Sequence, residues 1–229
     1  MQTGLTEESA TTAPEAASQA GARLSQAERT ARTRRRLLGA TLELVAERGY
    51  DRASLAAIGA RAGYSRGVVN HCFGSKAALL GELVAFMFQR WDHAQLRPAL
   101  GDRDGIEALV ATVNAVRRQA QEHPVELRAF YALLFEGLGP LPELRPRFAE
   151  FHRRLRAQTA SLITRGIEAG SIAAEIDAEA QAGLFVGAFR GVMYQWLLDP
   201  EGVNFDALLD AQIRMIEIGL RPVAAEGRN

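Results

Sequence analysis

The sequence is poor in cysteine: Cys72 is the only one in 229 residues, so no disulfide can form within the chain. Long apolar runs are also missing, because the longest stretch, residues 180–198, contains Arg190 and Gln195 and falls short of the ~20 apolar residues of a bilayer span. The N-terminal segment has neither a basic start nor an apolar run, which argues against a secretory signal. We therefore predict a cytoplasmic protein that has no membrane partner.

No segment of useful length alternates apolar and polar residues, so the sequence predicts no β-strand. Apolar residues instead recur at three- and four-residue spacing, and glycine and proline interrupt this pattern repeatedly. The fold class predicted from this periodicity is all-α, with about nine helices. Their expected ranges are residues 31–49, 55–62, 66–73, 76–96, 105–121, 125–138, 146–169, 178–198 and 205–220.

The net charge is zero, but the charges are unevenly distributed along the chain. Residues 1–21 have a charge of −3, residues 22–76 have eleven bases and four acids and a charge of +7, and residues 77–229 have a charge of −4. A basic block of this kind indicates an anionic partner. Residues 1–28 have no apolar period and are predicted to form a disordered tail, as is the short C-terminal segment 223–229.

Two short predicted helices in the basic block form a helix-turn-helix pattern over about residues 54–73. Gly63 can take the left-handed turn between them at no steric cost, while Ile58 and Val69 can fill the angle between the helices. The small Gly59 allows the two helices to approach closely. A helix placed in this way fits the major groove of DNA. The side chains expected on its outer face are those of Arg66, Val68, Asn70 and His71.

The segment from Ile58 to Lys76, IGARAGYSRGVVNHCFGSK, resembles the DNA-binding signature of the TetR family of transcriptional regulators, I-A-x-x-A-G-V-S-x-G-x-x-Y-x-H/Y-F-x-S-K. Residues 166–172 and 196–200 resemble phrases of the family's last helices, so the similarity covers about residues 30–220. The resemblance implies a homodimer that binds double-stranded operator DNA through a head, residues 29–76. It also implies a body, residues 77–222, that dimerises and binds a small organic effector.

The resemblance also implies roles for individual residues of the head. Arg66 and Val68, with Gly67 between them, match positions that face bases, and His71 shares their helix face. The positions that match phosphate contacts are Ser54, Ser65, Asn70, Cys72 and Lys76. Asn70 and Cys72 depart from the family's usual Tyr and Tyr or His; because Cys is a weak donor, we expect some contact with the DNA backbone to be lost. Gly59 replaces the usual Ala and is expected to loosen the first short helix slightly.

A run of arginines precedes the helix predicted from residue 31 or lies at its start. Its members are Arg23, Arg29, Arg32, Arg34, Arg35 and Arg36. Such residues normally form a solvated helix face, but beside a helix-turn-helix we favour a flexible basic arm that reaches phosphates or the minor groove. Arg32 and Arg35 are the members that we assign to DNA contact.

Aromatic residues gather in the predicted body, and most of them must belong to its core. The resemblance implies that some line an effector cavity, for which we name Met87, Trp91, Phe130, Phe135, Phe151, Phe189, Arg190 and Met193. Such a cavity predicts a largely hydrophobic or aromatic effector. Arg190 is the only charge between Glu179 and Asp199, inside a nearly all-apolar helix, and needs a partner there. That partner is either a carboxylate of the fold such as Glu217 or an anionic group of the effector.

The same apolar helix contains Gly183, Gly187 and Gly191 at four-residue spacing. Glycines placed in this way let two backbones approach closely, which predicts the two-fold interface of a dimer. The four histidines have no ligand spacing, so neither a metal nor a cofactor is predicted. The sequence predicts a regulator, most simply a repressor, with no catalytic residues. The alternative is a small helical enzyme or a ligand-sequestering protein whose basic head does not bind specific DNA.

Overall fold

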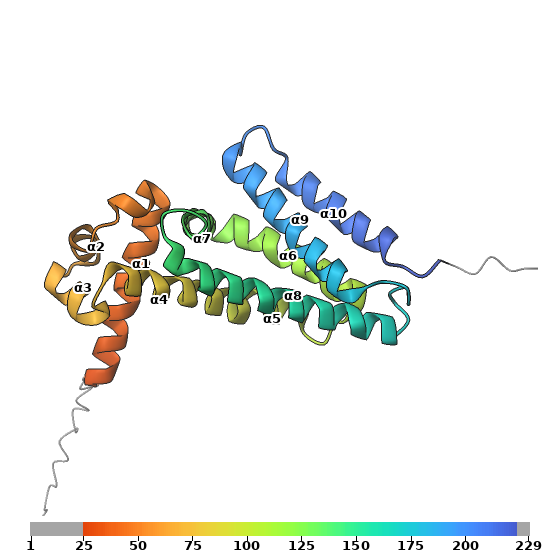
Figure 1. The fold of residues 1–229 in the computed structure, drawn as a ribbon, viewed down its shortest axis with the longest axis horizontal. Coiled ribbons are helices and arrows are strands. Elements are labelled where there is room, and N and C mark those ends of the chain that lie inside the picture. The colour runs from red at the N-terminus through yellow and green to blue at the C-terminus, as the bar shows by residue number, and fades with distance from the viewer. Residues whose placement is uncertain (1–24, 224–229) are drawn as a thin grey trace, which may run out of the picture.

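The computed structural model describes residues 25–223, and every regular element in this range is helical (Figure 1). The prediction of an all-α fold is therefore confirmed. The α-helices are α1 (Gln26–Arg52), α2 (Leu55–Ala62), α3 (Arg66–Phe73), α4 (Lys76–Arg90), α5 (Arg97–Leu100), α6 (Gly105–Glu122), α7 (Pro124–Glu136), α8 (Arg145–Glu168), α9 (Ala178–Leu198) and α10 (Phe205–Gly219). A π-helical turn, Trp91–Leu96, joins α4 to α5, and a 3-10 turn, Pro142–Leu144, precedes α8.

The first helix begins earlier than its apolar pattern predicts. The Ser25 hydroxyl accepts a hydrogen bond from the Glu28 amide at 3.2 Å, while the Glu28 carboxylate accepts one from the Ser25 amide at 2.6 Å. This reciprocal pair is a capping box, and its S-x-x-E signature was present in the sequence. Residues 26–28, expected in the disordered tail, are therefore the first turn of α1. The rest of that tail, 1–24, and residues 224–229 lie outside the described range.

The helix predicted over residues 76–96 also differs from the structure. Its α-helical part ends at Arg90, and the wider π turn from Trp91 to Leu96 leads into α5. Pro98 follows immediately and has no N–H with which to continue the regular hydrogen-bond ladder. Apolar periodicity does not distinguish an α-turn from a π-turn, so the sequence alone did not show this change.

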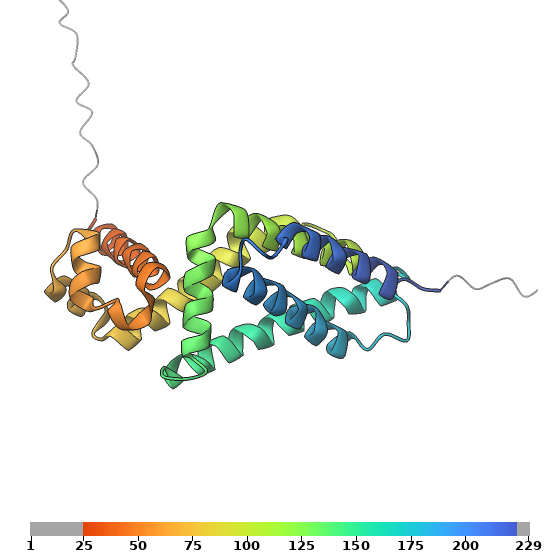
Figure 2. The ribbon, with the colours of Figure 1, turned by 90° about the horizontal axis from the view of Figure 1, so that it is seen from above.

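The head, made of α1, α2 and α3, lies at one end of the molecule, and the long helices of the body extend away from it (Figures 1 and 2). The head's core is formed by Leu37 and Leu44 of α1, Ile58 of α2 and Val69 of α3, all at most 2 % exposed. Burial of each such side chain contributes about 1.5–3 kcal/mol to folding. The turn between α2 and α3 is the predicted one, because Gly63 has a left-handed φ of 78°.

Gly59 has a packing role that goes beyond its low helix propensity. A Cβ atom at this position would lie 2.8 Å from the Tyr64 carbonyl oxygen, closer than side chains tolerate. The Tyr64 amide in turn donates to the Gly59 carbonyl at 2.8 Å. Gly59 therefore allows the close approach of α2 to the start of α3, which a larger residue would obstruct. This role is additional to the loosening of α2 expected from the sequence.

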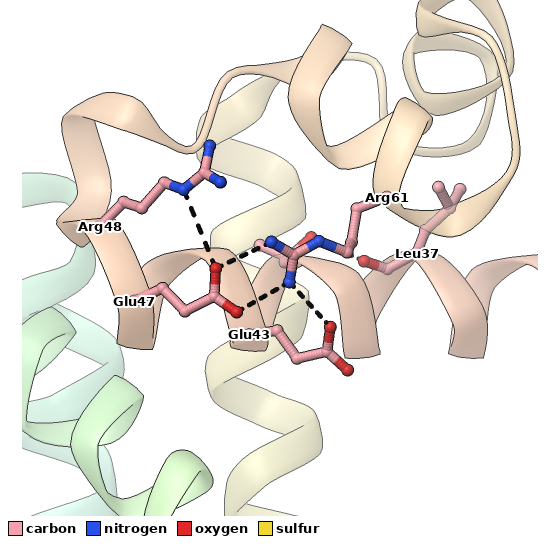
Figure 3. A network of polar contacts seen from close by, with 6 residues as sticks. Leu37, Glu43, Glu47, Arg48 and Arg61 are labelled. Atoms are coloured by element: carbon pink, nitrogen blue, oxygen red, sulfur yellow. Dashed lines mark hydrogen bonds and ion pairs between the residues drawn. The ribbon is translucent and has the colours of Figure 1, made fainter.

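A cluster of charges holds α2 against α1 on the outside of the head (Figure 3). The Arg61 guanidinium donates to both carboxylate oxygens of Glu47, at 2.9 and 2.8 Å, and to Glu43 at 3.1 Å. Arg48 lies 3.8 Å from the Glu47 carboxylate. A bidentate guanidinium–carboxylate pair fixes orientation as well as distance. The Arg61 guanidinium is therefore held on the outer surface of α1 and α2.

The head is not sealed from the body at residue 76. Helix α7 crosses beside α1 (Figure 2), and its Ala129 and Leu133 are fully buried in the same core cluster as the head residues. A second core cluster lies among α6, α8, α9 and α10 and includes Leu109, Ile163 and Leu209. The boundary predicted after residue 76 stays a prediction, but the first core continues across it.

Candidate functional site

One exposed surface of the head is the outer face of α3. Arg66, Gly67, Asn70 and His71 are exposed there, and Val68 is half-buried, while Val69 and Phe73 point into the core. This is the division of faces that the helix-turn-helix pattern predicted. A basic side chain at the start of a helix with an accessible outer face can reach the edges of bases in a major groove.

Two serines cap the short helices next to this face. The Ser54 hydroxyl accepts from the Ala57 amide at 3.2 Å, and the Ser65 hydroxyl accepts from the Val68 amide at 3.4 Å. Both side chains are exposed, and each keeps its hydroxyl proton free to donate to an anion. The first turns of α2 and α3 also present backbone N–H groups and the positive ends of their helix dipoles. The geometry thus allows the predicted phosphate contacts at Ser54 and Ser65.

Cys72 and Lys76 lie differently from the expectation. Cys72 is half-buried and packs against the head's core, as expected of a small apolar side chain. The Lys76 ammonium donates to the Tyr50 carbonyl at 2.7 Å and lies 3.8 Å from the centre of the Tyr50 ring. Burial lowers the pKa of Lys76, with the nearby Asp51 opposing this shift. Lys76 therefore stabilises the join between α1 and α4, and Cys72 is unsuited to a phosphate contact.

The arginines expected in a flexible arm are instead part of α1, except Arg23, which lies outside the described residues. Arg29, Arg32, Arg35 and Arg36 are exposed on this helix. Arg34 differs, because its guanidinium donates to the Cys72 carbonyl and the Glu82 carboxylate and lies 4.7 Å from the centre of the Phe73 ring. The arm prediction is wrong for this segment, since the capping box at Ser25 extends the helix through it.

The sequence analysis missed Tyr64, which lies in the turn between α2 and α3. Thr33 donates to its hydroxyl oxygen at 3.4 Å, and this bond, together with Arg36 and Arg32, lowers the pKa of Tyr64. The phenol therefore lies in the positive field of the α1 arginines. Its position in the turn between the two short helices was the signal available from the sequence.

The body contains a partly open cavity of about 90 Å³ whose walls are mostly apolar. Seven of the eight residues predicted for an effector pocket line it: Met87, Trp91, Phe130, Phe151, Phe189, Arg190 and Met193. Helix α4 and the π turn supply one wall, and α6, α7, α8 and α9 supply the others. Three aromatic rings of the lining stack or pack edge to face, those of Phe88, Phe130 and Phe151, and the Phe148 ring packs against the first two. A concave, mostly apolar site with a few polar groups is typical of small-molecule binding.

Phe135 is the exception among the predicted pocket residues. It is 46 % exposed at the end of α7, where its ring lies 5.5 Å from that of Tyr194 on α9. Phe135 follows Tyr131 by one helical turn, and that turn already lies beyond the cavity. The prediction of Phe135 as a pocket residue is therefore wrong.

Arg190 lines the cavity and does not pair with Glu217. Its guanidinium donates to the Tyr131 hydroxyl at 3.2 Å, and its central carbon lies 5.1 Å from the centre of the Phe130 ring. The Nε atom is buried and has no hydrogen-bond partner among the described residues. The fold therefore stabilises this cation through aromatic faces and one phenol rather than a carboxylate.

The other polar groups of the cavity escaped the sequence reasoning. Glu126 of α7 is only 6 % exposed and lies 3.5 Å from the Arg90 guanidinium. Tyr131 is also buried, and burial raises the pKa of its phenol, although Arg190 opposes this shift. Thr112 and Gln119 of α6 complete the polar lining. Thr112, Val116 and Gln119 follow helical spacing on one face of α6, and this spacing was the signal in the sequence.

The glycine series of α9 faces outward. A Cβ atom at Gly183, Gly187 or Gly191 would have no other atom of the described chain within 4 Å. Beside these glycines, large apolar side chains are exposed: Leu184, Tyr194 and Leu198 on α9, and Met215 and Ile218 on α10. The residues on α10 were not predicted. Together these positions define an apolar face, which we call the α9–α10 face.

Two further properties of residues 25–223 concern metal binding and membrane insertion. No group of three or more histidine, cysteine, aspartate or glutamate side chains is placed to hold a metal ion within residues 25–223. No single helix in that range is long and apolar enough to cross a membrane. Helix α3 and the segment Lys76–Leu100 are long and apolar enough only when they are taken together, and the two meet at a 69° bend.

Comparison with known proteins agrees with this arrangement. Residues 37–83 match the family described as bacterial regulatory proteins, tetR family, and residues 105–218 match the BetI-type transcriptional repressor C-terminal family. The chain is 27 % identical to the HTH-type transcriptional regulator SrpR of Pseudomonas putida over 189 residues, which are 82 % of each protein. It is 30 % identical to the HTH-type transcriptional regulator BetI of Cronobacter sakazakii over 148 residues, covering 58 % of this chain and 73 % of that protein.

Solved structures show the same fold. A TetR transcriptional regulator from Chloroflexus aurantiacus superposes with a TM-score of 0.76 at 20 % identity, covering 85 % of this chain and 99 % of that one. A transcriptional regulator from Saccharomonospora viridis in complex with choline superposes with a TM-score of 0.75 at 22 % identity, covering 83 % and 98 %. With a helix-turn-helix head, a helical body and both family matches in the expected order, this chain belongs to the TetR family of bacterial transcriptional regulators.

Proposed function

We propose that this TetR-family regulator is a repressor that binds a palindromic operator as a homodimer and releases it when a small, largely hydrophobic or aromatic molecule enters the body cavity. The observation that carries this proposal is that α4 connects the head to the cavity. Its first residue, Lys76, bonds to the Tyr50 carbonyl in the head, and Met87 and Phe88 near its other end line the cavity. A ligand that displaces the second part of this helix therefore acts on the head.

The DNA contacts follow from the exposed groups of the head. Arg66 and Val68 are placed to meet base edges, and Asn70 and His71 extend the same face. The hydroxyls of Ser54 and Ser65 and the exposed Arg32 and Arg35 supply donors for phosphates. One such head offers few contacts, so two heads at a fixed spacing are needed for a specific site.

The α9–α10 face supports dimerisation. Met215 is 74 % exposed and Ile218 is 80 % exposed, which leaves large apolar surface in water on a single chain. The glycines of α9 leave room for a second helix to approach its backbone. An isologous contact of this face with its copy would bury both features and would fix the distance between the two recognition helices.

Coupling requires the effector to bind the two arrangements of the dimer with different affinity. A ligand that fits the cavity only when α4 has shifted favours the spacing that does not match the operator. The structure of the regulator from Saccharomonospora viridis is a complex with choline, which supports a body of this fold as a site for small organic molecules. The identity of the ligand does not transfer with the fold at 22 % identity.

A mobility-shift experiment tests the proposal. The full chain is mixed with DNA fragments from its own genomic neighbourhood, with random DNA of equal length as competitor. A specific site is expected to bind with a Kd of ~10⁻⁸–10⁻¹¹ M and to survive the competitor. Equal binding to all fragments would instead favour the alternative, in which the body is enzymatic or sequesters a ligand and the head does not bind specific DNA.

A further inference from the structure

Two ionisable side chains with opposite charges line the cavity, but only one of them has a charged partner. Glu126 lies 3.5 Å from Arg90, which neutralises it from the outer side of the wall. Arg190 forms no ion pair with any carboxylate in the described range, residues 25–223. The cavity therefore has an excess of positive charge at Arg190.

The surroundings of Arg190 leave most of its hydrogen-bonding capacity unused. A guanidinium has five N–H groups, and the structure gives this one a single bond, to the Tyr131 hydroxyl. The buried Nε atom is among the donors that lack an acceptor. A desolvated donor that lacks a hydrogen bond costs free energy, so an acceptor that entered the cavity would be bound favourably.

The positive charge of Arg190 also affects the neighbouring His152. The pKa of His152 falls to about 4 because of burial, with further contributions from Arg190 and Arg156. The buried His152 Nε2 atom has no hydrogen-bond partner in the described range. Among the described residues, the carboxylate that lines the cavity is that of Glu126, and it is paired with Arg90 rather than with Arg190.

The aromatic rings that could attract a cationic ligand already contact Arg190. Its guanidinium carbon lies 5.1 Å from the centre of the Phe130 ring and 5.7 Å from each of the Tyr131 and Phe151 ring centres. Aromatic faces arranged in this way are how proteins hold quaternary ammonium groups. In this chain an incoming ammonium ion would meet a guanidinium at the same rings, so the site repels cations.

We propose that the effector cavity selects a compact organic monocarboxylate, with an aromatic or short aliphatic body against the phenylalanines and its carboxylate accepting hydrogen bonds from Arg190. This inference rests on the proposed function, because it names the ligand class of the same cavity. A volume of about 90 Å³ favours a body no larger than one aromatic ring.

A surface groove gives such a ligand a route to the cavity. The groove lies between the end of α4 and α8 and shares Phe88, Trp91, Phe151 and Leu155 with the cavity lining. The Phe88 and Phe151 rings are stacked with centres 3.9 Å apart and an interplanar angle of 10°. Both rings line the groove as well as the cavity, so their rotation would widen the passage between the two spaces.

A matched series of ligands tests the charge preference directly. Binding of phenylacetate, 2-phenylethanol, 2-phenylethylammonium and choline to the full-length protein is measured by titration calorimetry, without DNA. Phenylacetate is expected to bind about 10- to 100-fold more tightly than the alcohol, the range of a hydrogen-bonded charge pair. Neither cation should bind measurably. Benzoate and hexanoate extend the carboxylate arm to other body shapes.

Substitution of Arg190 provides the second half of the test. Arg190→Met should bring the affinity for phenylacetate down to that for 2-phenylethanol, and Arg190→Lys should keep a reduced preference for the carboxylate. Arg153→Met removes an exposed arginine of α8 that does not line the cavity and should leave the preference unchanged. Thermal melting checks that each variant is folded, and Arg190→Gln replaces Arg190→Met if the latter is not.

The outcomes separate this inference from the proposed function. The ligand class is overturned if none of the three carboxylates binds, if the alcohol or a cation binds as tightly, or if the preference survives loss of Arg190. Carboxylate binding through Arg190 that leaves the operator complex intact supports the ligand class and contradicts the effector role. Release of operator by an uncharged compound, with no carboxylate bound, contradicts the ligand class alone.

Discussion

The head and the cavity are built in opposite ways. The side chains of the head that we propose to face DNA lie mainly on α3, a helix of eight residues, and most of them are exposed. The cavity walls come from α4, the π turn, α6, α7, α8 and α9, and their side chains pack against one another. The difference teaches that substitutions in the head should act one contact at a time, whereas substitutions in the body should spread through packing or assembly.

The largest expected effect breaks the assembly of the body while leaving each chain intact. Gly187→Leu places a side chain where a Cβ atom meets nothing within 4 Å in one chain, so the monomer should fold normally. On the α9–α10 face it should push a second copy away. We expect loss of the dimer in ultracentrifugation and a loss of operator affinity of about 100-fold or more, because the two heads then no longer bind together.

A leucine on another exposed helical face provides the control for this change. Gln89→Leu on α4 adds similar apolar area on a helix that packs against α1, α7 and α8, and it should leave a dimer that binds its operator. A Gly187→Leu variant that stayed dimeric with normal melting would place the interface on another surface.

The next prediction concerns a single contact in the head. Arg66→Ala should cost about 1–3 kcal/mol on the cognate operator and relax the preference at one base position, with little effect on random DNA. Competition binding against a set of single-base operator variants measures both effects. If the affinities for cognate and random DNA fell by the same factor, Arg66 would contact a phosphate rather than a base. The assignment of base contacts on α3 would then be wrong.

A third prediction uses pH to examine packing in the body. The folded state holds His152 with a pKa of about 4, so folding favours the neutral imidazole, whereas the unfolded chain protonates it near pH 6.5. This contribution to stability is complete above pH 6.5 and is lost as the pH falls toward 4. Because the side chain is only half-buried, we expect a loss of about 1–2 kcal/mol over that window.

His152→Gln provides the comparison for this pH effect. The amide does not titrate, so the free energy of unfolding measured in denaturant at pH 6.5 and 4.5 should change less for the variant than for the wild-type protein. Equal pH dependence of the two proteins would show that carboxylates on the surface, such as Glu47 and Glu150, control acid stability instead.

The smallest effect is expected from the arginines of α1. Arg32→Ala and Arg35→Ala should each reduce the slope of log affinity against log salt concentration by about 0.9 if the side chain neutralises one phosphate. Arg61→Ala is a useful contrast, because Arg61 is already bound to Glu43 and Glu47 and should not change the slope. Unchanged slopes for Arg32→Ala and Arg35→Ala would place this face of α1 away from the DNA.

The two regions also differ in how far the sequence alone could predict them. The head was predictable almost residue by residue, since caps, a left-handed glycine and an outer face are local features of a short segment. Its errors came from a second role for the same residue: Lys76 and Cys72 serve the join between helices, and Arg34 holds Glu82. In the cavity, the aromatic content of the body and the family resemblance led to seven of the lining residues but not to its polar groups.

What the sequence could not supply was the pairing of the inward groups. Arg190 was recognised as a buried charge, but whether Glu217 or Tyr131 would meet it depends on how α7 and α10 sit against α9. The role of Phe135 depended on where the cavity ends along α7, which helical spacing does not determine. Both questions concern the relative placement of helices that are distant along the chain.

The burial of Ala129 and Leu133 of α7 in the same cluster as Leu37 and Ile58 has a consequence for protein engineering. A head grafted at residue 76 onto the body of a relative would meet a foreign α7 and would inherit a hole or a clash in its own core. Replacing one buried leucine by a smaller side chain typically costs 2–5 kcal/mol, which is a large share of a small domain's stability. Exchange of DNA specificity between such regulators therefore requires that the matching surface of α7 be transplanted together with the reading helix.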